Sequence, residues 1–397
     1  MSDFFPSIPK EEFNQRMSNF KKKMADNNID IVIAYSTLCD PSTVRYFSDV
    51  SPINENLAMI IPLEGDAIVC SGQACHEWSH YNSKIENIII MPEVGEVAGT
   101  AYSMDGQMNF EELFVELKSK YNIKKVGYIG ELLIPYCITS KAEKVFGGAE
   151  FMFADEILYE LRIYKSENEI NCIKKAADII SNAFTYAIPR VAVGSTELDL
   201  EADLTASFLR QGAESTCYAL TPMVGSGVER STLCQARNSL RKIEEKEIIS
   251  TVGGCCYNGY NGVISTPLVL GDIPQEMSDV IKMAHECLHF VADKMKPGVT
   301  SIELIDYYHN FLDGKGGFAQ YSPYGAVHSI GLIECEYPFF GPYVPTVMVE
   351  NMTVAIDVYL KGLSWGSFRI EDTFVIRKNG AEMLTWFNDK HIPATFK

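Results

Sequence analysis

The stretch that decides the fold of this chain runs from Ile248 to Gly271 and reads IISTVGGCCYNGYNGVISTPLVLG. Two apolar runs, residues 248–252 and 263–270, flank a segment rich in glycine, asparagine and tyrosine. Apolar runs of this length around a glycine-containing turn are typical of two antiparallel strands. We therefore expect a β-hairpin that directs side chains into a cleft.

The composition bounds the class of protein. With 397 residues the chain is long enough for two domains and a large core. Its hydrophobic share of 47% and charged share of 22% are ordinary for a soluble globular protein. The formal net charge of −18 argues against nucleic acid or an anionic membrane as a partner, because both are polyanions. A small neutral or cationic molecule is the expected substrate.

The first residues, MSDFFPSIPKEEFNQR, have neither the basic nor the apolar region of a secretion signal, and no apolar run reaches the length of a membrane span. We therefore expect a soluble, cytoplasmic protein. The chain has 11 cysteines, an odd number, without a paired CxxC repeat. They are expected to be free thiols in a reducing compartment, and their spacing gives no support for a structural zinc site.

The first part of the chain alternates apolar strand-like runs with helical ones, which is an α/β pattern. Helices are expected over residues 10–28 and 110–121, and strands begin near residues 29, 57, 88 and 125. A long helix follows from Ser166 to Ala187, with Ser166 as its N-cap and Glu169 as the partner in a capping box. We place the domain boundary before this helix, which gives domains 1–155 and 156–397.

The second part begins with that long helix and is expected to contain further helices over residues 197–211, 274–294 and 301–312, followed by strands. Its last strands carry the polar candidates: His328 in YGAVHSIGLIECEYP, Asp357 in TVAIDVYL, and Arg369 and Glu371 in FRIEDTFVI. Strand alternation puts Arg369 and Glu371 on one face. A carboxylate at Asp357 would be costly if it were buried without a partner, which favours a cleft-lining role. The structural alternatives are a hydrogen-bonded histidine and an ion pair between Arg369 and Glu371.

These motifs resemble the pita-bread superfamily, which contains methionine aminopeptidase, aminopeptidase P, prolidase and creatinase. The resemblance rests on the junction ELRIYKSENEI, the Tyr-x-Gly-Tyr element of the hairpin, the His-Ser-x-Gly element at His328 and the closing Arg-x-Glu-Asp-Thr strand. It implies an α+β, creatinase-type two-domain chain, with a smaller N-terminal α/β domain and a C-terminal pita-bread domain. It also implies a homodimer.

The resemblance bears on metal binding, because the hairpin of the superfamily's peptidases carries two metal-binding aspartates. When Tyr257, Gly259 and Tyr260 are matched to the family pattern, the first of these positions falls on or beside Val252 and the second on Val263. A valine can neither bridge nor neutralise a pair of cations. We therefore expect that the dinuclear site is lost and that the protein uses no cofactor. A single divalent metal is not excluded.

Two histidines of the peptidases are also missing. The histidine that precedes the hairpin falls on Cys234 or Gln235, and the one that follows the His-x-x-Gly element falls on Cys335. Creatinase, which uses no metal, keeps a histidine in a setting similar to that of His328. The resemblance thus argues against ordinary peptidase activity and favours a metal-independent relative of creatinase or ectoine hydrolase.

We therefore predict a creatinase-like hydrolase of a non-peptide C–N bond in a small amidine, guanidino or amino-acid-derived molecule. His328 would act as the general acid or base, and Asp357 and Glu371 would orient it or hold a cationic group of the substrate. Arg369 would bind a substrate carboxylate. The other predicted substrate-binding residues are Tyr260, Cys256, Cys335 and Tyr337, and the structural alternative for Cys256 is a small packing residue.

Two alternatives stay open. A single metal on His328, Asp357 and Glu371 would give a mononuclear Xaa-Pro peptidase-like hydrolase or lyase, since three ligands and an open position are chemically sufficient. The same fold could instead serve as a non-catalytic binding module. A cleft filled by Val252, Val263 and their neighbours would favour that second alternative.

Overall fold

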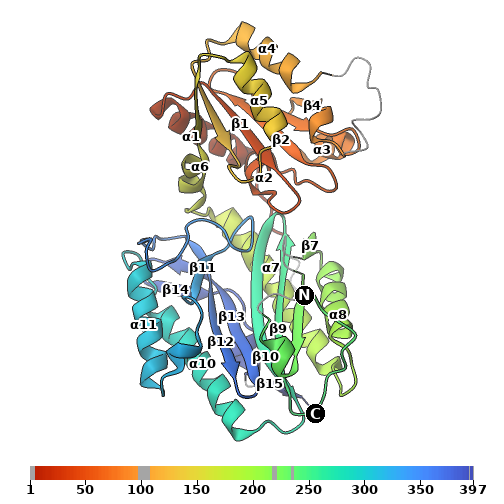
Figure 1. The fold of residues 1–397 in the computed structure, drawn as a ribbon, viewed down its shortest axis with the longest axis vertical. Helices are drawn as coiled ribbons and strands as arrows, with labels where there is room; N and C mark the ends of the chain where they lie inside the picture. Colours follow the sequence, from red (N-terminus) through yellow and green to blue (C-terminus); the bar gives the residue numbers. More distant parts are fainter. Residues whose placement is uncertain (1–4, 97–107, 217–220, 234–236, 393, 397) are drawn as a thin grey trace. The chain divides into compact units, whose positions relative to one another are not determined.

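The structure, a computed structural model, describes residues 5–96, 108–216, 221–233, 237–392 and 394–396. The chain divides into two compact units, Ile8–Arg162 and Ile163–Lys397, and the second unit also includes the first residues as far as Ser7. Figure 1 shows the elements of both units. None of the helices in the described part of the chain is long and apolar enough to cross a membrane.

The unit Ile8–Arg162 is built on a six-stranded sheet with the order β4-β3-β2-β1-β5-β6. Strand β1 pairs with β2 in antiparallel orientation and with β5 in parallel orientation, as expected for an α/β unit. The strands are β1 (Ile31–Ser36), β2 (Leu57–Pro62), β3 (Ile68–Ser71), β4 (Ile88–Ile90), β5 (Lys125–Ile129) and β6 (Glu150–Phe153). The helices are α1 (Lys10–Asp26), α2 (Ser42–Ser48), α3 (His76–Asn82), α4 (Phe110–Lys120), α5 (Tyr136–Val145) and α6 (Asp155–Arg162).

The unit Ile163–Lys397 is built on a sheet whose main path runs β11-β12-β13-β10-β9-β7, with β14 beside β13, β15 beside β10 and β8 beside β9. The strands are β7 (Ser215–Thr216), β8 (Met223–Ser226), β9 (Ile248–Tyr257), β10 (Tyr260–Leu270), β11 (Val327–Ser329), β12 (Thr353–Leu363), β13 (Gly366–Arg377), β14 (Gly380–Met383) and β15 (Ala394–Phe396). The helices are α7 (Glu167–Ala187), α8 (Glu197–Arg210), α9 (Gly227–Ser231), α10 (Gln275–Lys294), α11 (Ser301–Gly314) and α12 (Phe387–His391).

The hairpin expected from the opening stretch is confirmed. Strands β9 and β10 pair in antiparallel register from Tyr257 opposite Tyr260 to Ile248 opposite Val269. The two turn residues, Asn258 and Gly259, have φ values of 49° and 84°. Positive φ at both positions matches the two-residue hairpin turn whose twist fits the flanking strands, and glycine adopts it without steric cost.

The long helix expected at Ser166 is also confirmed, together with its cap. In α7 the Ser166 hydroxyl accepts a hydrogen bond from the Glu169 amide at 3.1 Å, and the Glu169 carboxylate accepts one from the Ser166 amide at 2.7 Å. This capping box satisfies two amides at the helix N-terminus.

All four long helices of the second unit pack on the same face of its sheet. The buried residues Ile356 of β12, Ile370 of β13 and Ile264 of β10 belong to the cores formed with α10 and α11 or with α7 and α8. Successive residues of a strand point to opposite faces. Asp357 of β12 and Glu371 of β13 have the opposite parity to Ile356 and Ile370 and therefore lie on the face away from these helices.

Candidate active site

The site is built on neighbouring strands whose register brings polar residues together. Asp357 of β12 lies opposite Glu371 of β13, and Glu371 lies opposite Ser265 of β10. Residues that pair directly across antiparallel strands share a face of the sheet. The strands β12, β13 and β10 thus place these three side chains in one row on the face away from the four long helices.

His328 enters this row from β11, where it pairs with Ala355. Its Nε2 lies 3.1 Å from Oε1 of Glu371 and 3.4 Å from Oε1 of Glu334. Its Nδ1 lies 3.1 Å from the carbonyl oxygen of Ser329. With Nδ1–H donating to that carbonyl, Nε2 is left to face the two carboxylates, which is the tautomer that a metal-binding histidine needs.

His328, Glu334 and Glu371 form a group whose ligand atoms all lie within 4.8 Å of one another. Glu371 is further fixed by Ser265, whose hydroxyl donates a hydrogen bond of 2.6 Å to Oε2. One imidazole and two carboxylates are suitable ligands for a divalent transition metal. The donor set of these three residues therefore fits one such cation.

Asp357 adds an oxygen that the protein leaves unsatisfied. Its Oδ2 accepts a hydrogen bond of 2.6 Å from the Tyr324 hydroxyl and lies 3.6 Å from Nη1 of Arg369. Its Oδ1 is buried and has no hydrogen-bond partner among the described residues. A buried carboxylate oxygen without a donor is costly unless a cation or a substrate group satisfies it.

Arg369 connects this group to a neighbouring pocket. Its guanidinium lies over the Tyr359 ring, 4.7 Å from the ring centroid. The pocket lies next to the hairpin and is lined by residues of the β8–α9 segment and of the sheet, among them Met223, Leu233, Val252, Tyr359 and Arg369. An arginine at the wall of a mainly apolar pocket can bind a carboxylate through two parallel hydrogen bonds.

The pKa values of His328 and Glu371 shift in opposite directions. Burial lowers the pKa of His328, but its contacts with Cys335 and Glu371 and the charges of Glu334 and Glu371 outweigh burial and raise it well above its ordinary value. Burial raises the pKa of Glu371, but the hydrogen bond and charge of His328, with Arg369 and Ser265, outweigh burial and lower it. In the absence of a cation, His328 and Glu371 therefore form an ion pair.

The pKa values of the other two carboxylates, Glu334 and Asp357, are raised. Burial raises the pKa of Glu334, and the charge of Glu371 acts in the same direction. Burial also raises the pKa of Asp357, and again the charge of Glu371 adds to the shift. Among the described residues, the three carboxylates thus share the site with the basic groups of His328 and Arg369. A divalent cation would offset the excess of negative charge.

The structure brings some of the predicted site residues together and separates others. His328, Glu371, Asp357 and Arg369 gather as described, and the thiol of the exposed Cys335 contacts His328. Tyr337 packs edge-on against Phe339, with ring centroids 5.9 Å apart.

The two hairpin candidates are engaged elsewhere. Tyr260 shares the helix-covered face with Ile264, and its hydroxyl donates to Glu169 of α7 at 2.7 Å. Cys256 is buried, and its thiol lies 3.6 Å from Oε2 of Glu214. The positions Cys234 and Gln235, on which a peptidase histidine was expected to fall, lie outside the described residues.

Val252 and Val263 lie on the same face as Glu371 and pack together. With Ile330 and Ala355 they form a small buried apolar cluster, against which Met223 packs. The cluster contributes no oxygen atom at the two positions where the superfamily's peptidases carry aspartates. At this site the described residues therefore offer a cation the ligands His328, Glu334 and Glu371. Val252 and Val263 of the hairpin contribute no ligand atom.

Sequence reasoning missed Glu334, Tyr324 and Ser265. Glu334 had a signal, because it directly precedes Cys335, the position matched to a metal-binding histidine of the peptidases. A carboxylate beside a vacated ligand position is a candidate replacement ligand. Tyr324 and Ser265 had no comparable signal, since their role depends on register and on loop closure.

The chain belongs to the metallopeptidase family M24, because residues 171–378, just over half of the chain, match that family. The residues of the candidate site all lie within this range. The pita-bread superfamily and the α+β fold class expected from the sequence are thereby confirmed.

Several individual peptidases are similar to this chain over nearly its whole length. The chain is 27% identical over 374 residues to a Xaa-Pro dipeptidase from Pyrococcus horikoshii, an alignment that covers 94% of this chain and 97% of the relative. The solved prolidase from that organism superposes with a TM-score of 0.79 at 26% identity, covering 94% of this chain and 98% of the other. An X-Pro aminopeptidase from Thermotoga maritima shares the fold, with a TM-score of 0.80, 21% identity and coverage of 93% and 97%.

Two expectations from the sequence are therefore wrong. The relatives are peptidases, which contradicts a hydrolase of non-peptide C–N bonds. The family is one of metallopeptidases, which contradicts a protein without a metal cofactor. The two valines of the hairpin had suggested that the metal site was lost. The sequence did not reveal that Glu334 joins His328 and Glu371 as a third potential ligand.

Proposed function

We propose that this protein is a Xaa-Pro dipeptidase-like hydrolase that works with one divalent cation held by His328, Glu334 and Glu371. The observation that carries the proposal is the convergence of these three ligand atoms within 4.8 Å. The relatives named Xaa-Pro dipeptidase support the reaction class, because they align with nearly the whole chain. Relative to the mononuclear alternative drawn from the sequence, Glu334 replaces Asp357 as the third ligand.

The protein's own groups would prepare the site for peptide hydrolysis. A bound cation of this kind polarises a carbonyl group and lowers the pKa of a water molecule. The Ser329 carbonyl holds the His328 ring through Nδ1, and Ser265 holds Glu371 through Oε2. Both contacts fix the ligands before substrate binds, which limits the reorganisation needed during the reaction.

The substrate would be oriented by charges at its two ends. Arg369 would bind the carboxylate of a dipeptide, beside the apolar side chains of Met223 and Leu233 that line the same pocket. The unsatisfied Oδ1 of Asp357 would accept a hydrogen bond from the substrate's ammonium group. A free dipeptide carries both charges, whereas a longer peptide separates them.

The test is cation-dependent proline release from Ala-Pro and Gly-Pro. The chelated protein should be inactive and should recover activity with Mn²⁺, Co²⁺ or Zn²⁺, while the reversed dipeptides Pro-Ala and Pro-Gly should remain uncleaved. His328→Ala and Glu371→Gln should each lose at least about 100-fold in kcat/KM, since each removes a ligand. The matched control is His80→Ala, which removes an exposed histidine of α3.

Two results would refute the proposal. One is full activity after complete removal of divalent cations. The other is equal activity of His328→Ala and His80→Ala on the Xaa-Pro substrates. Arg369→Lys should raise KM more than it lowers kcat, because lysine keeps the charge and loses the two-bond geometry.

The apolar cluster around Val252 and Val263 favours a second candidate, a dipeptide-binding module on the same fold. Calorimetry separates the two candidates. Saturable binding of Ala-Pro without proline release at any cation concentration would support the binding module, and turnover would exclude it. The homodimer implied by the resemblance stays a prediction.

A further inference from the structure

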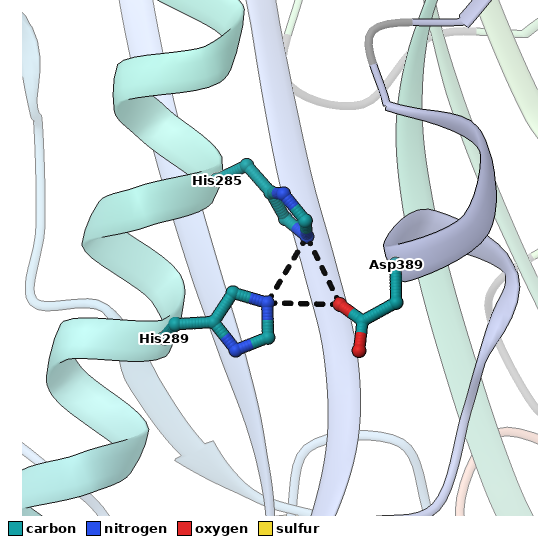
Figure 2. A group of neighbouring side chains, drawn as sticks. All are labelled: His285, His289 and Asp389. Carbon is teal, nitrogen blue, oxygen red and sulfur yellow. Dashed lines mark hydrogen bonds and ion pairs between the residues drawn. The ribbon is translucent and has the colours of Figure 1, made fainter.

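A second group of potential metal ligands lies outside the candidate active site and shares no residue with it. Helix α10 carries His285 and His289 in the sequence His-Glu-Cys-Leu-His, and the short helix α12 carries Asp389. Residues four apart on a helix project from the same side. Figure 2 shows both imidazoles directed at the Asp389 carboxylate.

The three ligand atoms converge closely. Nε2 of His285 lies 3.2 Å from Oδ1 of Asp389, and Nε2 of His289 lies 2.8 Å from the same oxygen. The two Nε2 atoms lie 3.2 Å from each other. These three ligand atoms all lie within 4.8 Å of one another, as do those of His328, Glu334 and Glu371. Two imidazole nitrogens that approach each other beside a carboxylate oxygen form a suitable ligand set for one metal ion.

The donor types select a class of metal. Two imidazoles and one carboxylate suit zinc, nickel, copper or cobalt, whereas calcium and magnesium prefer sites made only of oxygen. The side chains of His289 and Asp389 are 43% and 44% exposed, which leaves room for a water ligand.

We infer that His285, His289 and Asp389 form a structural site for a Zn²⁺-class transition metal that joins α12 to α10. The spacing of the two histidines matches a helix motif of zinc peptidases, in which the intervening glutamate is a general base. Here that glutamate, Glu286, forms an ion pair with Lys315 at 3.0 Å, and its side chain is 60% exposed. The site is therefore assigned a structural and not a hydrolytic role.

Helix α12 gives this site a connection to the sheet. Asn388, the neighbour of Asp389, donates hydrogen bonds to the carbonyl oxygens of Ser265 and Glu371 at 3.0 and 3.1 Å and to Oδ2 of Asp372 at 2.9 Å. A metal that holds α12 against α10 would stabilise this anchor behind Glu371. The expected effect is on stability and on the order of α12.

The chain offers a matched comparison in another histidine pair. His76 and His80 are also four residues apart on a helix, and their ring centroids lie 4.6 Å apart, close to the 4.7 Å between His285 and His289. Among the described residues, no carboxylate or thiolate completes the pair of α3 to a group of three. A variant at His80 thus controls for nonspecific binding of Zn²⁺ by paired surface histidines.

The experiment uses the full chain with His328→Ala, so that the proposed active-site cation does not interfere. Zn²⁺ is titrated into chelator-treated protein by competition with a chromophoric chelator, and thermal unfolding is recorded with and without Zn²⁺. We expect one equivalent of Zn²⁺ and a rise in Tm, since a ligand that binds only the folded state stabilises it. Mg²⁺ should give no rise. Hydrogen exchange in residues 387–391 should slow with Zn²⁺.

Added separately, His289→Ala and Asp389→Asn should each weaken Zn²⁺ binding by at least about tenfold and abolish the rise in Tm. The added His80→Ala should change neither quantity. Asp389→Asn keeps the inference testable if His289→Ala fails to fold, because it alters the other helix and keeps the side-chain size. Equal Zn²⁺ affinity of the His289→Ala and His80→Ala proteins would overturn the inference, as would absence of Zn²⁺ binding by the His328→Ala protein.

Discussion

Ser265 shows how a single uncharged residue supports the candidate active site. Its hydroxyl donates to Oε2 of the buried Glu371, and that hydrogen bond is one of the contacts that keep the pKa of Glu371 low. The next residue, Thr266, has a buried hydroxyl without a partner among the described residues. Ser265 and Thr266 lie on opposite faces of β10, and of the two only the Ser265 hydroxyl faces the candidate active site.

Ser265→Ala should weaken binding of the active-site cation by about tenfold, because Glu371 would lose the contact that orients it. The free energy of unfolding should fall by about 1–2 kcal/mol. The matched control is Thr266→Val, which keeps the side-chain size and removes a hydroxyl that has no hydrogen-bond partner among the described residues. It should leave cation affinity unchanged and stability equal or higher. Calorimetric titration and chemical denaturation measure both effects, and equal losses in the two variants would contradict the assigned role of Ser265.

Val263→Asp tests whether the apolar cluster borders the cation site. Val263 is fully buried, so an added carboxylate should destabilise the cation-free protein by several kcal/mol. If the new carboxylate faces the cation held by His328, Glu334 and Glu371, Mn²⁺ should restore most of the lost stability. Thermal unfolding with and without Mn²⁺ reports this recovery. A destabilisation that Mn²⁺ leaves unchanged would separate the cluster from the cation site.

At the scale of elements, α8 is tied to the β8–α9 segment by Glu197. This carboxylate accepts hydrogen bonds from the Ser226 hydroxyl at 2.9 Å, the Arg230 Nε at 2.7 Å and the Ser239 hydroxyl at 2.8 Å. Burial raises the pKa of Glu197, but the bonds from Arg230, Ser239 and Ser226 outweigh it and lower the pKa below its ordinary value of 4.5. Met223, which lines the pocket beside Arg369, belongs to the segment that Glu197 holds.

The lowered pKa gives stability a predictable pH dependence. The ionised Glu197 stabilises the folded state at pH values above 4.5, and this contribution is lost as pH falls through the lower folded-state pKa. Glu197→Gln should reduce stability at pH 7 by about 3 kcal/mol and flatten the acid limb of the stability curve. The exposed Glu276→Gln serves as the control. Denaturation between pH 3 and 7 measures the slopes, and identical slopes in the wild type and Glu197→Gln would refute the assignment.

Helix and strand boundaries were largely predictable at this scale. The capping box of α7 and the hairpin turn of β9 and β10 are local, because they depend on residues within a few positions of each other. The direction of Tyr260 followed from the two-residue period of β10, which places it with Ile264 on the helix-covered face. Its assignment as a substrate-binding residue had relied on motif position alone.

At the scale of the whole molecule, the chain contains two units with separate cores. The unit Ile8–Arg162 has its own six-stranded sheet and a buried hydrophobic cluster on that sheet whose members all belong to the unit. A unit of this size with its own sheet and its own hydrophobic cluster is large enough to fold alone. The candidate active site, in contrast, is formed by residues of the second unit.

The fragment Ile8–Arg162 should therefore fold by itself. We expect a mixed helix and strand signal in circular dichroism and one cooperative unfolding transition. As a control, the same fragment with Phe114→Ala, which leaves a cavity in the buried core, should be less stable by about 3–5 kcal/mol. A fragment without a cooperative transition would show that the first unit depends on the rest of the chain.

The sequence by itself determined the superfamily and the α+β fold, and it predicted His328, Asp357, Arg369 and Glu371 as candidate site residues, since all of these depend on local patterns and on motif spacing. Only the tertiary structure decided that Glu334 joins His328. The loop after β11 is held by a buried ion pair of 2.6 Å between Glu336 and Lys165, and Glu334 and Cys335 both lie beside His328. Which carboxylate of this loop reaches His328 depends on how the loop packs against residues distant in the chain, and strand periodicity carries no information about that packing.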